Sequence, residues 1–146
     1  MIHQLSGFRL YFSSIILSLA YLLGFDPFGY QLLGLLSVSI LFYFALKLDE
    51  RKAALLFFLF GFFLYCTGLY WLYISIHIVS GAPKTLALLL IALLSVYLSI
   101  FHSIFGLVFV KLHRRISSEW ISLLFVAPSL WIFLEFLRGY FLTGFP

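Results

Sequence analysis

The chain consists largely of five long runs of apolar residues separated by short polar segments. The runs cover approximately residues 8–25, 28–46, 53–79, 85–110 and 120–142. A helix needs about 20 apolar residues to cross a bilayer core about 30 Å thick. The first two runs are short and are joined at Asp26-Pro27, where a turn is favoured because proline ends helices. The pattern predicts an all-α integral membrane protein, a bundle of about five transmembrane helices in one domain over residues 1–146, with a hairpin at its start.

The composition excludes a water-soluble fold. Hydrophobic residues make up 64% of the chain and charged residues only 10%, whereas an average soluble domain has about 45–50% and about 25%. The first run follows Arg9 and could be mistaken for a signal peptide. It lacks a clear small-x-small cleavage site, however, and an equally apolar run follows it at once. We therefore interpret the first run as a retained membrane span.

The basic residues are distributed unevenly between the two ends of the predicted helices. Seven of the nine fall on the side of the N-terminus: Arg9, Lys47, Arg51, Lys52, Lys111, Arg114 and Arg115. Only Lys84 and Arg138 fall on the other side. Because cytoplasmic loops carry an excess of basic residues, the N-terminus is predicted to be cytoplasmic. The charges lie between apolar runs and do not cover one face, which argues against nucleic-acid binding.

The fifth run carries two opposite charges, Glu135 and Arg138, three residues apart. A charged side chain within a span costs roughly 2.5–3.5 kcal/mol on insertion scales and normally faces a bundle interior, a cavity or a ligand. The spacing allows an ion pair one helical turn apart. The pair could simply neutralise itself and brace helix contacts, or the arginine could hold a phospholipid headgroup or orient an attached domain.

The end of the third run contains Trp71, Tyr73, Ser75 and His77, followed by Lys84. Aromatic rings of this kind are typical of the membrane interface. The alternative is that Ser75, His77 and Lys84 help to form a lipid-headgroup site at the outer leaflet.

Two predicted helices also carry stripes of small residues, which favour close helix packing or, alternatively, a substrate groove. The stripes are Gly61, Gly68 and Ser75 in one helix, and Ala92, Ser95, Ser99, Ser103 and Gly106 in the other.

No catalytic residue, metal site or cofactor is predicted from the remaining reactive side chains. The four histidines show no ligand spacing, and no carboxylate partners them in sequence. The single cysteine, Cys66, can form no internal disulfide and lies within an apolar run without a nearby base, where a thiol is inert.

Several motifs together resemble bacterial apolipoprotein N-acyltransferases over essentially the whole chain. The motifs are Trp71-Leu72-Tyr73-Ile74-Ser75-Ile76 with Gly81-Ala82-Pro83, Leu130-Trp131 with Glu135-Phe136-Leu137-Arg138-Gly139, Thr143-Gly144-Phe145-Pro146, Phe25-Asp26-Pro27-Phe28 and Tyr97-Leu98-Ser99. The resemblance implies a multi-pass bacterial inner-membrane enzyme. Such an enzyme moves an acyl chain from a phospholipid to the α-amino group of the diacylglyceryl-cysteine at a lipoprotein's N-terminus. It implies a cysteine nucleophile, a glutamate base and an oxyanion-binding lysine, all in a nitrilase-like domain.

The chain departs from that family in ways that bear on its activity. It has five predicted spans where the family has about eight, and no residue matches the three catalytic residues. The tryptophan that usually follows the Phe-Pro pair is also missing. The chain therefore resembles the N-terminal membrane portion of such an enzyme, cut inside an outer loop and expected to be inactive alone. A variant of this hypothesis splits the enzyme over two polypeptides, with a separately encoded nitrilase-like domain as partner.

The resemblance also suggests which residues give lipid access or seat the catalytic domain. They are Trp71, Tyr73, Ser75, His77, Glu135, Arg138 and Phe145. The partners it implies are phospholipid and diacylated lipoprotein. The alternative class is a stand-alone small membrane protein, either a binding or assembly subunit or a transporter-like protein. A transporter would carry polar groups near the midplane and inverted halves, whereas the ion pair here is predicted near the outer end.

Overall fold

The computed structural model describes residues 7–116 and 118–141, with side chains from residue 12 onward, and every regular element in these ranges is helical. The longer helices are α1 (Gly7–Leu22), α2 (Gln31–Leu46), α3 (Glu50–Gly68), α5 (Lys84–Ile116) and α7 (Ala127–Tyr140). The shorter segments are α4 (Tyr70–Tyr73), α6 (Glu119–Ile121) and two π-helical turns, η1 (Ile74–Val79) and η2 (Ser122–Val126).

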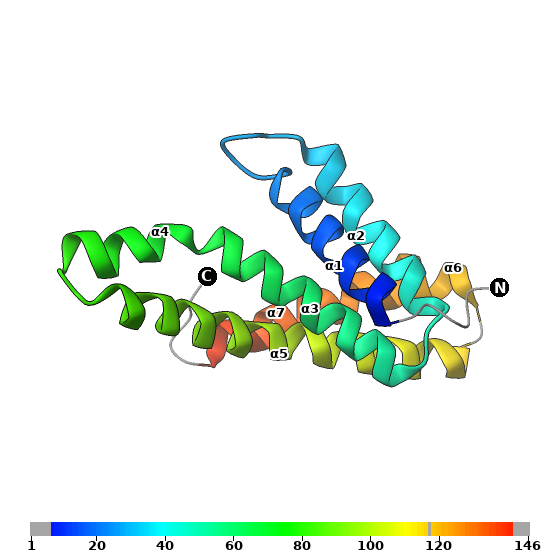
Figure 1. The fold of residues 1–146 in the computed structure, drawn as a ribbon. Coiled ribbons are helices and arrows are strands. Elements are labelled where there is room, and N and C mark those ends of the chain that lie inside the picture. The colour runs from blue at the N-terminus through cyan, green and yellow to red at the C-terminus, as the bar shows by residue number, and fades with distance from the viewer. Residues whose placement is uncertain (1–6, 117, 142–146) are drawn as a thin grey trace.

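Three helical stretches in the described chain are long and apolar enough to cross a membrane: Glu50–Gly68, Lys84–Ile116 and Glu119–Tyr140. The shorter apolar helices are Phe12–Leu22, Gln31–Leu46 and Tyr70–Val79. The prediction of an all-α membrane bundle is therefore confirmed. α1 and α2 form a hairpin that packs on α3 through α1, and its loop end splays away from α3, α5 and α7 (Figure 1).

Small residues let α3 and α5 pack closely over most of their length. A Cβ atom at Gly106 would lie 2.6 Å from the carbonyl oxygen of Ala53, and one at Gly61 would lie 3.1 Å from the ring of His102. Ser95 and Ser99, from the same stripe of α5, are buried. The stripes thus lie at helix contacts over much of their length, although Ser75, at the end of the α3 stripe, is exposed.

The third predicted span is not one continuous helix. α3 ends at Gly68, and Leu69 has φ −90° and ψ 17°, outside the helical range. Glycine is a poor helix former, so a break at Gly68 is inexpensive. The chain continues as α4 and η1.

A π-helical turn, η2, ends two residues before Pro128, whose ring cannot fit against the carbonyl of the residue four positions earlier in a regular helix. The wider η2 turn lets the helix continue from Glu119 to Tyr140.

A polar cluster joins the helix ends on the predicted cytoplasmic side. Lys47 Nζ lies 2.7 Å from Glu119 Oε1, and Arg114 Nη1 lies 3.5 Å from Glu50 Oε1. The bond to Glu119 raises the pKa of the Lys47 ammonium. The Asp49 side chain caps α3 by accepting from the backbone N–H of Lys52, which lowers the pKa of the Asp49 carboxyl.

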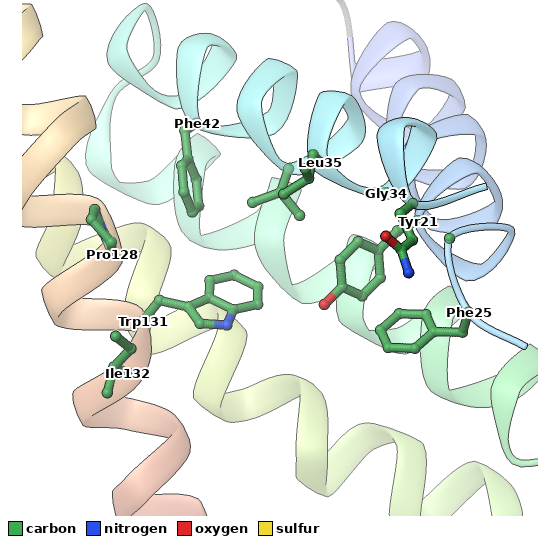
Figure 2. A pocket seen from close by; sticks show the side chains of 11 residues that line it. Tyr21, Phe25, Gly34, Leu35, Phe42, Pro128, Trp131 and Ile132 are labelled. Carbon is green, nitrogen blue, oxygen red and sulfur yellow. The ribbon is translucent and has the colours of Figure 1, made fainter. Parts of the chain in front are cut away.

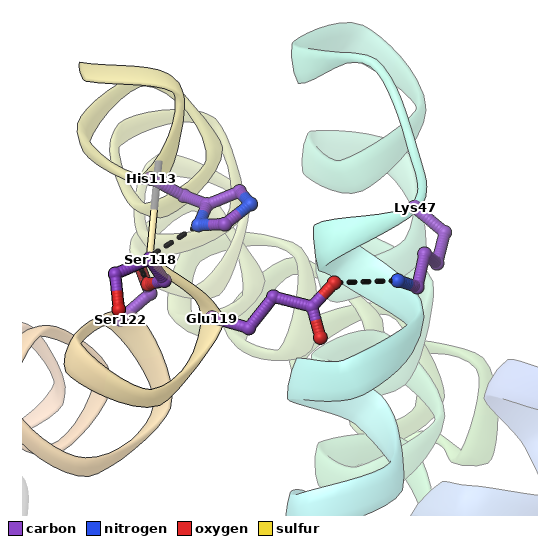
Figure 3. A network of polar contacts seen from close by, with 5 residues as sticks. All are labelled: Lys47, His113, Ser118, Glu119 and Ser122. Carbon is purple, nitrogen blue, oxygen red and sulfur yellow. Dashed lines mark hydrogen bonds and ion pairs between the residues drawn. The ribbon is translucent and has the colours of Figure 1, made fainter. Parts of the chain in front are cut away.

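Hydrogen bonds among His113, Ser118 and Ser122 link the end of α5 to α6 and η2 (Figure 3). Ser122 Oγ donates to the Ser118 carbonyl at 2.8 Å. Since that bond uses the hydroxyl's one proton, His113 Nδ1 donates to Ser122 Oγ, also at 2.8 Å. The bonds hold α5 against the start of the last helix.

Candidate functional site

A cavity of about 700 Å³ lies between the loop end of the α1–α2 hairpin and the bundle formed by α3, α5 and α7. Its wall combines the loop at residues 25–28, the end of α3, Tyr70, and one residue of α5. α7 contributes three side chains, Trp131, Glu135 and Arg138, at successive positions along one face. Helix spacings of three and four residues place side chains on the same face. The two charges of the fifth predicted span therefore line a cavity.

Arg138 is the centre of the polar part of this wall. Its Nη2 atom lies 2.5 Å from Glu135 Oε2, so the predicted i,i+3 ion pair forms. Its Nη1 atom donates to the Tyr65 hydroxyl, and its guanidinium carbon lies 5.8 Å from the centre of the Tyr65 ring. The Nε atom is buried and has no hydrogen-bond partner among the described residues.

The cluster is largely shielded from solvent and carries no net charge. The Arg138 side chain is 14% exposed and that of Glu135 is 35% exposed. Removing charges from water is costly unless they are paired and hydrogen-bonded, and here the ion pair and the tyrosine offset that cost. A neutral polar patch of this kind can hold the polar part of an amphiphile whose chain contacts the apolar wall.

His102 and Trp131 form the inner wall of the cavity. The His102 ring is buried and meets Tyr65 and Trp131 edge-on, at centroid distances of 5.5 and 5.1 Å. Its Nδ1 atom lies 3.4 Å from the Leu98 carbonyl of its own helix. Gly61 leaves room for this ring, because a side chain there would contact it. His102 is thus a packed wall residue that presents an imidazole to the cavity.

The structure places the other predicted site residues apart from Glu135 and Arg138. Trp71 and Ser75 are exposed on the α4–η1 segment, and Ser75 Oγ donates to the Trp71 carbonyl at 3.4 Å. Tyr73 and His77 lie ring to ring at 5.1 Å, with His77 Nδ1 2.7 Å from the Ala82 carbonyl. None of the four lines the cavity; their neighbour Tyr70 does. Phe145 lies outside the described residues.

Sequence reasoning missed the aromatic and imidazole side chains of the wall: Tyr21, Tyr65, His102 and Trp131. One signal pointed to His102, because an ionisable residue inside a span is rare and usually faces a bundle interior or cavity. Tyr65 carried no such signal, since tyrosines are common in this chain. Within the described residues no group of three histidine, cysteine or acidic side chains is placed to hold a metal ion, and Cys66 is a free, half-buried thiol.

Comparison with known proteins gives a consistent set of relatives. The family model described as the apolipoprotein N-acyltransferase N-terminal domain matches residues 17–146. A protein named apolipoprotein N-acyltransferase from Vibrio cholerae is 37% identical over 125 residues, 85% of this chain and 24% of the relative.

Two further relatives carry the same name. The protein from Photobacterium profundum is 32% identical over 124 residues, 85% of this chain and 24% of its own length. The protein from Shewanella oneidensis is 31% identical over 144 residues, 98% of this chain and 27% of its own. The chain thus spans about a quarter of the length of the curated relatives it matches.

Proposed function

The chain belongs to the apolipoprotein N-acyltransferase family, to whose N-terminal domain it corresponds, and on this premise we propose that it forms the membrane part of a lipoprotein N-acylating enzyme. The reaction would move an acyl chain from a phospholipid to the α-amino group of a diacylglyceryl-cysteine at a lipoprotein's N-terminus. The protein would be a multi-pass component of the bacterial inner membrane with a cytoplasmic N-terminus.

The observation that carries this proposal is the cavity whose wall bears Glu135, Arg138 and Tyr65 inside an apolar bundle. These three residues lie within the matched range 17–146. A buried polar cluster in a membrane domain is costly and is typical of a place where a polar group of a ligand is received. A lipid offers such a group at the head of its acyl chains.

The covalent chemistry would be carried by a nitrilase-like domain, in the same polypeptide or a separate one. A cysteine thiolate there displaces the lysophospholipid and forms a thioester, and the amine of the lipoprotein then displaces the thiolate and forms an amide. The 146 residues contain no match to the nucleophile, base or oxyanion-binding lysine. Their part is to admit lipid and seat the catalytic domain. Trp71, Tyr73, Ser75 and His77 would contribute from the α4–η1 segment, outside the cavity, and Phe145 lies beyond the described residues.

The test is a chimera in which residues 1–146 replace the matching quarter of the Vibrio cholerae relative. Expressed in bacteria depleted of their own N-acyltransferase, the chimera should restore growth and yield triacylated lipoprotein, read by mass spectrometry. The Arg138→Ala chimera, present in the membrane at the same abundance, should yield less triacylated lipoprotein than the unaltered chimera. Residues 1–146 alone should leave a diacylated lipoprotein peptide unchanged.

Two results would count against the proposal. Acylation of the peptide by the purified 146-residue chain would show that it carries its own catalytic residues. Failure of a well-expressed, correctly inserted chimera to acylate would instead favour the stand-alone membrane protein as its role.

A further inference from the structure

A second cavity, of about 490 Å³, lies between the α1–α2 hairpin and α7 and adjoins the first (Figure 2). Both cavities share Tyr21, Phe25 and Trp131 as lining residues. Most of the second cavity's wall is hydrophobic, with main contributions from Leu35, Val38 and Phe42 of α2 and from Pro128, Trp131 and Ile132 of α7. We call it the apolar chamber.

The apolar chamber is elongated along α2. Its lining runs from Gln31 to Phe42, which is about 16 Å along the helix axis. Phe42 closes the far end, because its ring packs at 5.3 Å from Phe105 and 5.8 Å from Trp131. An apolar space of this volume and length can hold an extended hydrocarbon chain.

Two polar groups stand where the apolar chamber meets the first cavity. The Tyr21 hydroxyl and the Trp131 indole face each other across the space (Figure 2). Among the described residues neither group makes a hydrogen bond to a protein atom. Both can donate to a carbonyl oxygen, and a tyrosine or tryptophan facing an apolar space usually finds such a partner.

The two cavities follow each other along α7. Pro128, Trp131 and Ile132 line the apolar chamber, whereas Trp131, Glu135 and Arg138 line the first cavity further along the helix. An amphiphile lying along α7 would therefore meet apolar wall first, the Tyr21 and Trp131 donors next, and the charged cluster last. This order matches a lipid, which has a chain, an ester carbonyl and a polar head in sequence.

We infer that the apolar chamber binds one acyl chain of a bilayer lipid, whose ester carbonyl accepts hydrogen bonds from Tyr21 and Trp131. The surrounding medium supplies the occupant, because the bundle's helices are apolar enough to cross a membrane. Burial of the chain is favourable relative to water but gains far less relative to lipid, so the two donors supply the selectivity. Binding of this kind needs no acyl transfer and would hold even if the chain had another function.

The test uses the whole 146-residue chain in lipid nanodiscs that contain a phosphatidylcholine with a diazirine in one acyl chain. After illumination, crosslinked residues are mapped by mass spectrometry. Crosslinks are expected at α2 positions 35 and 38 and at α7 positions 128, 131 and 132. Leu35→Trp, which puts an indole into the apolar chamber, should lower their yield by about tenfold, the change expected when a site loses a pocket contact worth ~1.4 kcal/mol.

Leu36→Trp is the matched control. Leu35 and Leu36 are neighbours on α2 and both exposed, at 67% and 56%, but only Leu35 lines the apolar chamber. Leu36→Trp should leave the crosslinks unchanged. Equal losses from both variants, or crosslinks spread evenly over exposed α2 positions, would mean annular lipid and would overturn the inference.

Tyr21→Phe separates the carbonyl contact from simple chain packing. It should lower crosslinking by the ester lipid and leave crosslinking by the matching ether lipid, which has no carbonyl, unchanged. An equal effect on both lipids would show that Tyr21 does not donate a hydrogen bond to the ester carbonyl. Circular dichroism and gel filtration of each variant establish that it has folded.

Discussion

At the scale of single residues, Arg138 decides the character of the candidate site. Its planar guanidinium holds Glu135 through one nitrogen and Tyr65 through another, so it connects two helices. A lysine could not reproduce this, since its ammonium lacks the fixed fork of donors. The ion pair is predicted by the i,i+3 spacing, whereas the bond to Tyr65 joins residues 73 positions apart and leaves no local signal.

Arg138→Ala should destabilise the bundle by about 3 kcal/mol, because it leaves the Glu135 carboxylate partly buried without its partner. The double variant Glu135→Gln/Arg138→Ala should recover part of this loss. The unfolding free energy of each variant is measured in mixed detergent micelles, with circular dichroism as the readout. If the double variant is as unstable as the sum of Glu135→Gln and Arg138→Ala, the pair contributes no coupling and the account of the cluster is wrong.

At the scale of helices, close approach depends on positions without side chains. Gly106 of α5 faces the backbone of α3, and an added methyl group would meet the Ala53 carbonyl oxygen at 2.6 Å and a Phe57 ring carbon at 2.7 Å. Rigid backbone cannot yield as a flexible side chain can. The small-residue stripe predicted this packing, because its members lie on one face of a helix.

Gly106→Ala should therefore lower the unfolding free energy by about 1–3 kcal/mol, the usual cost of overpacking a core. The matched control is Gly139→Ala in α7, where an added Cβ meets nothing within 4 Å among the described residues. That variant should be neutral or gain up to about 1 kcal/mol from helix propensity. Thermal unfolding in detergent compares the two, and equal effects would contradict the α3–α5 contact.

At the scale of the whole molecule, the two ends of the bundle differ in chemistry. One end carries the Lys47–Glu119 and Arg114–Glu50 pairs, and the other carries the hairpin loop with the α4–η1 segment (Figure 1). The excess of basic residues at the first end predicts that it is cytoplasmic. The candidate cavity would then lie in the outer half of the membrane, on the side where the proposed function places the lipoprotein.

Cysteine labelling tests this orientation. In a Cys66→Ala background, Ser80→Cys should react with a membrane-impermeant maleimide in intact spheroplasts. Ile116→Cys, at the C-terminal end of α5, should react only after permeabilisation; both positions are exposed. Labelling of Ile116→Cys alone in intact spheroplasts would invert the topology, together with the placement of the cavity.

The membrane bundle, the hairpin at Asp26-Pro27 and the Glu135–Arg138 pair follow from the sequence by itself. Each depends on hydropathy or on spacing within one segment, and such short-range patterns determine helices and their surface pairs. The helix break at Leu69 was not predicted, because hydropathy continues unchanged across it.

Only the tertiary structure decided what the charged pair faces. Tyr65, His102 and Tyr21 come from three different helices, and each enters the cavity wall because packing of those helices turns it inward. The same packing separates Glu135 and Arg138 from Trp71, Tyr73, Ser75 and His77, which the sequence grouped with them as candidate site residues. Hydropathy and spacing report on one helix at a time, whereas a cavity is made by the angle between helices, which depends on contacts far apart in the chain.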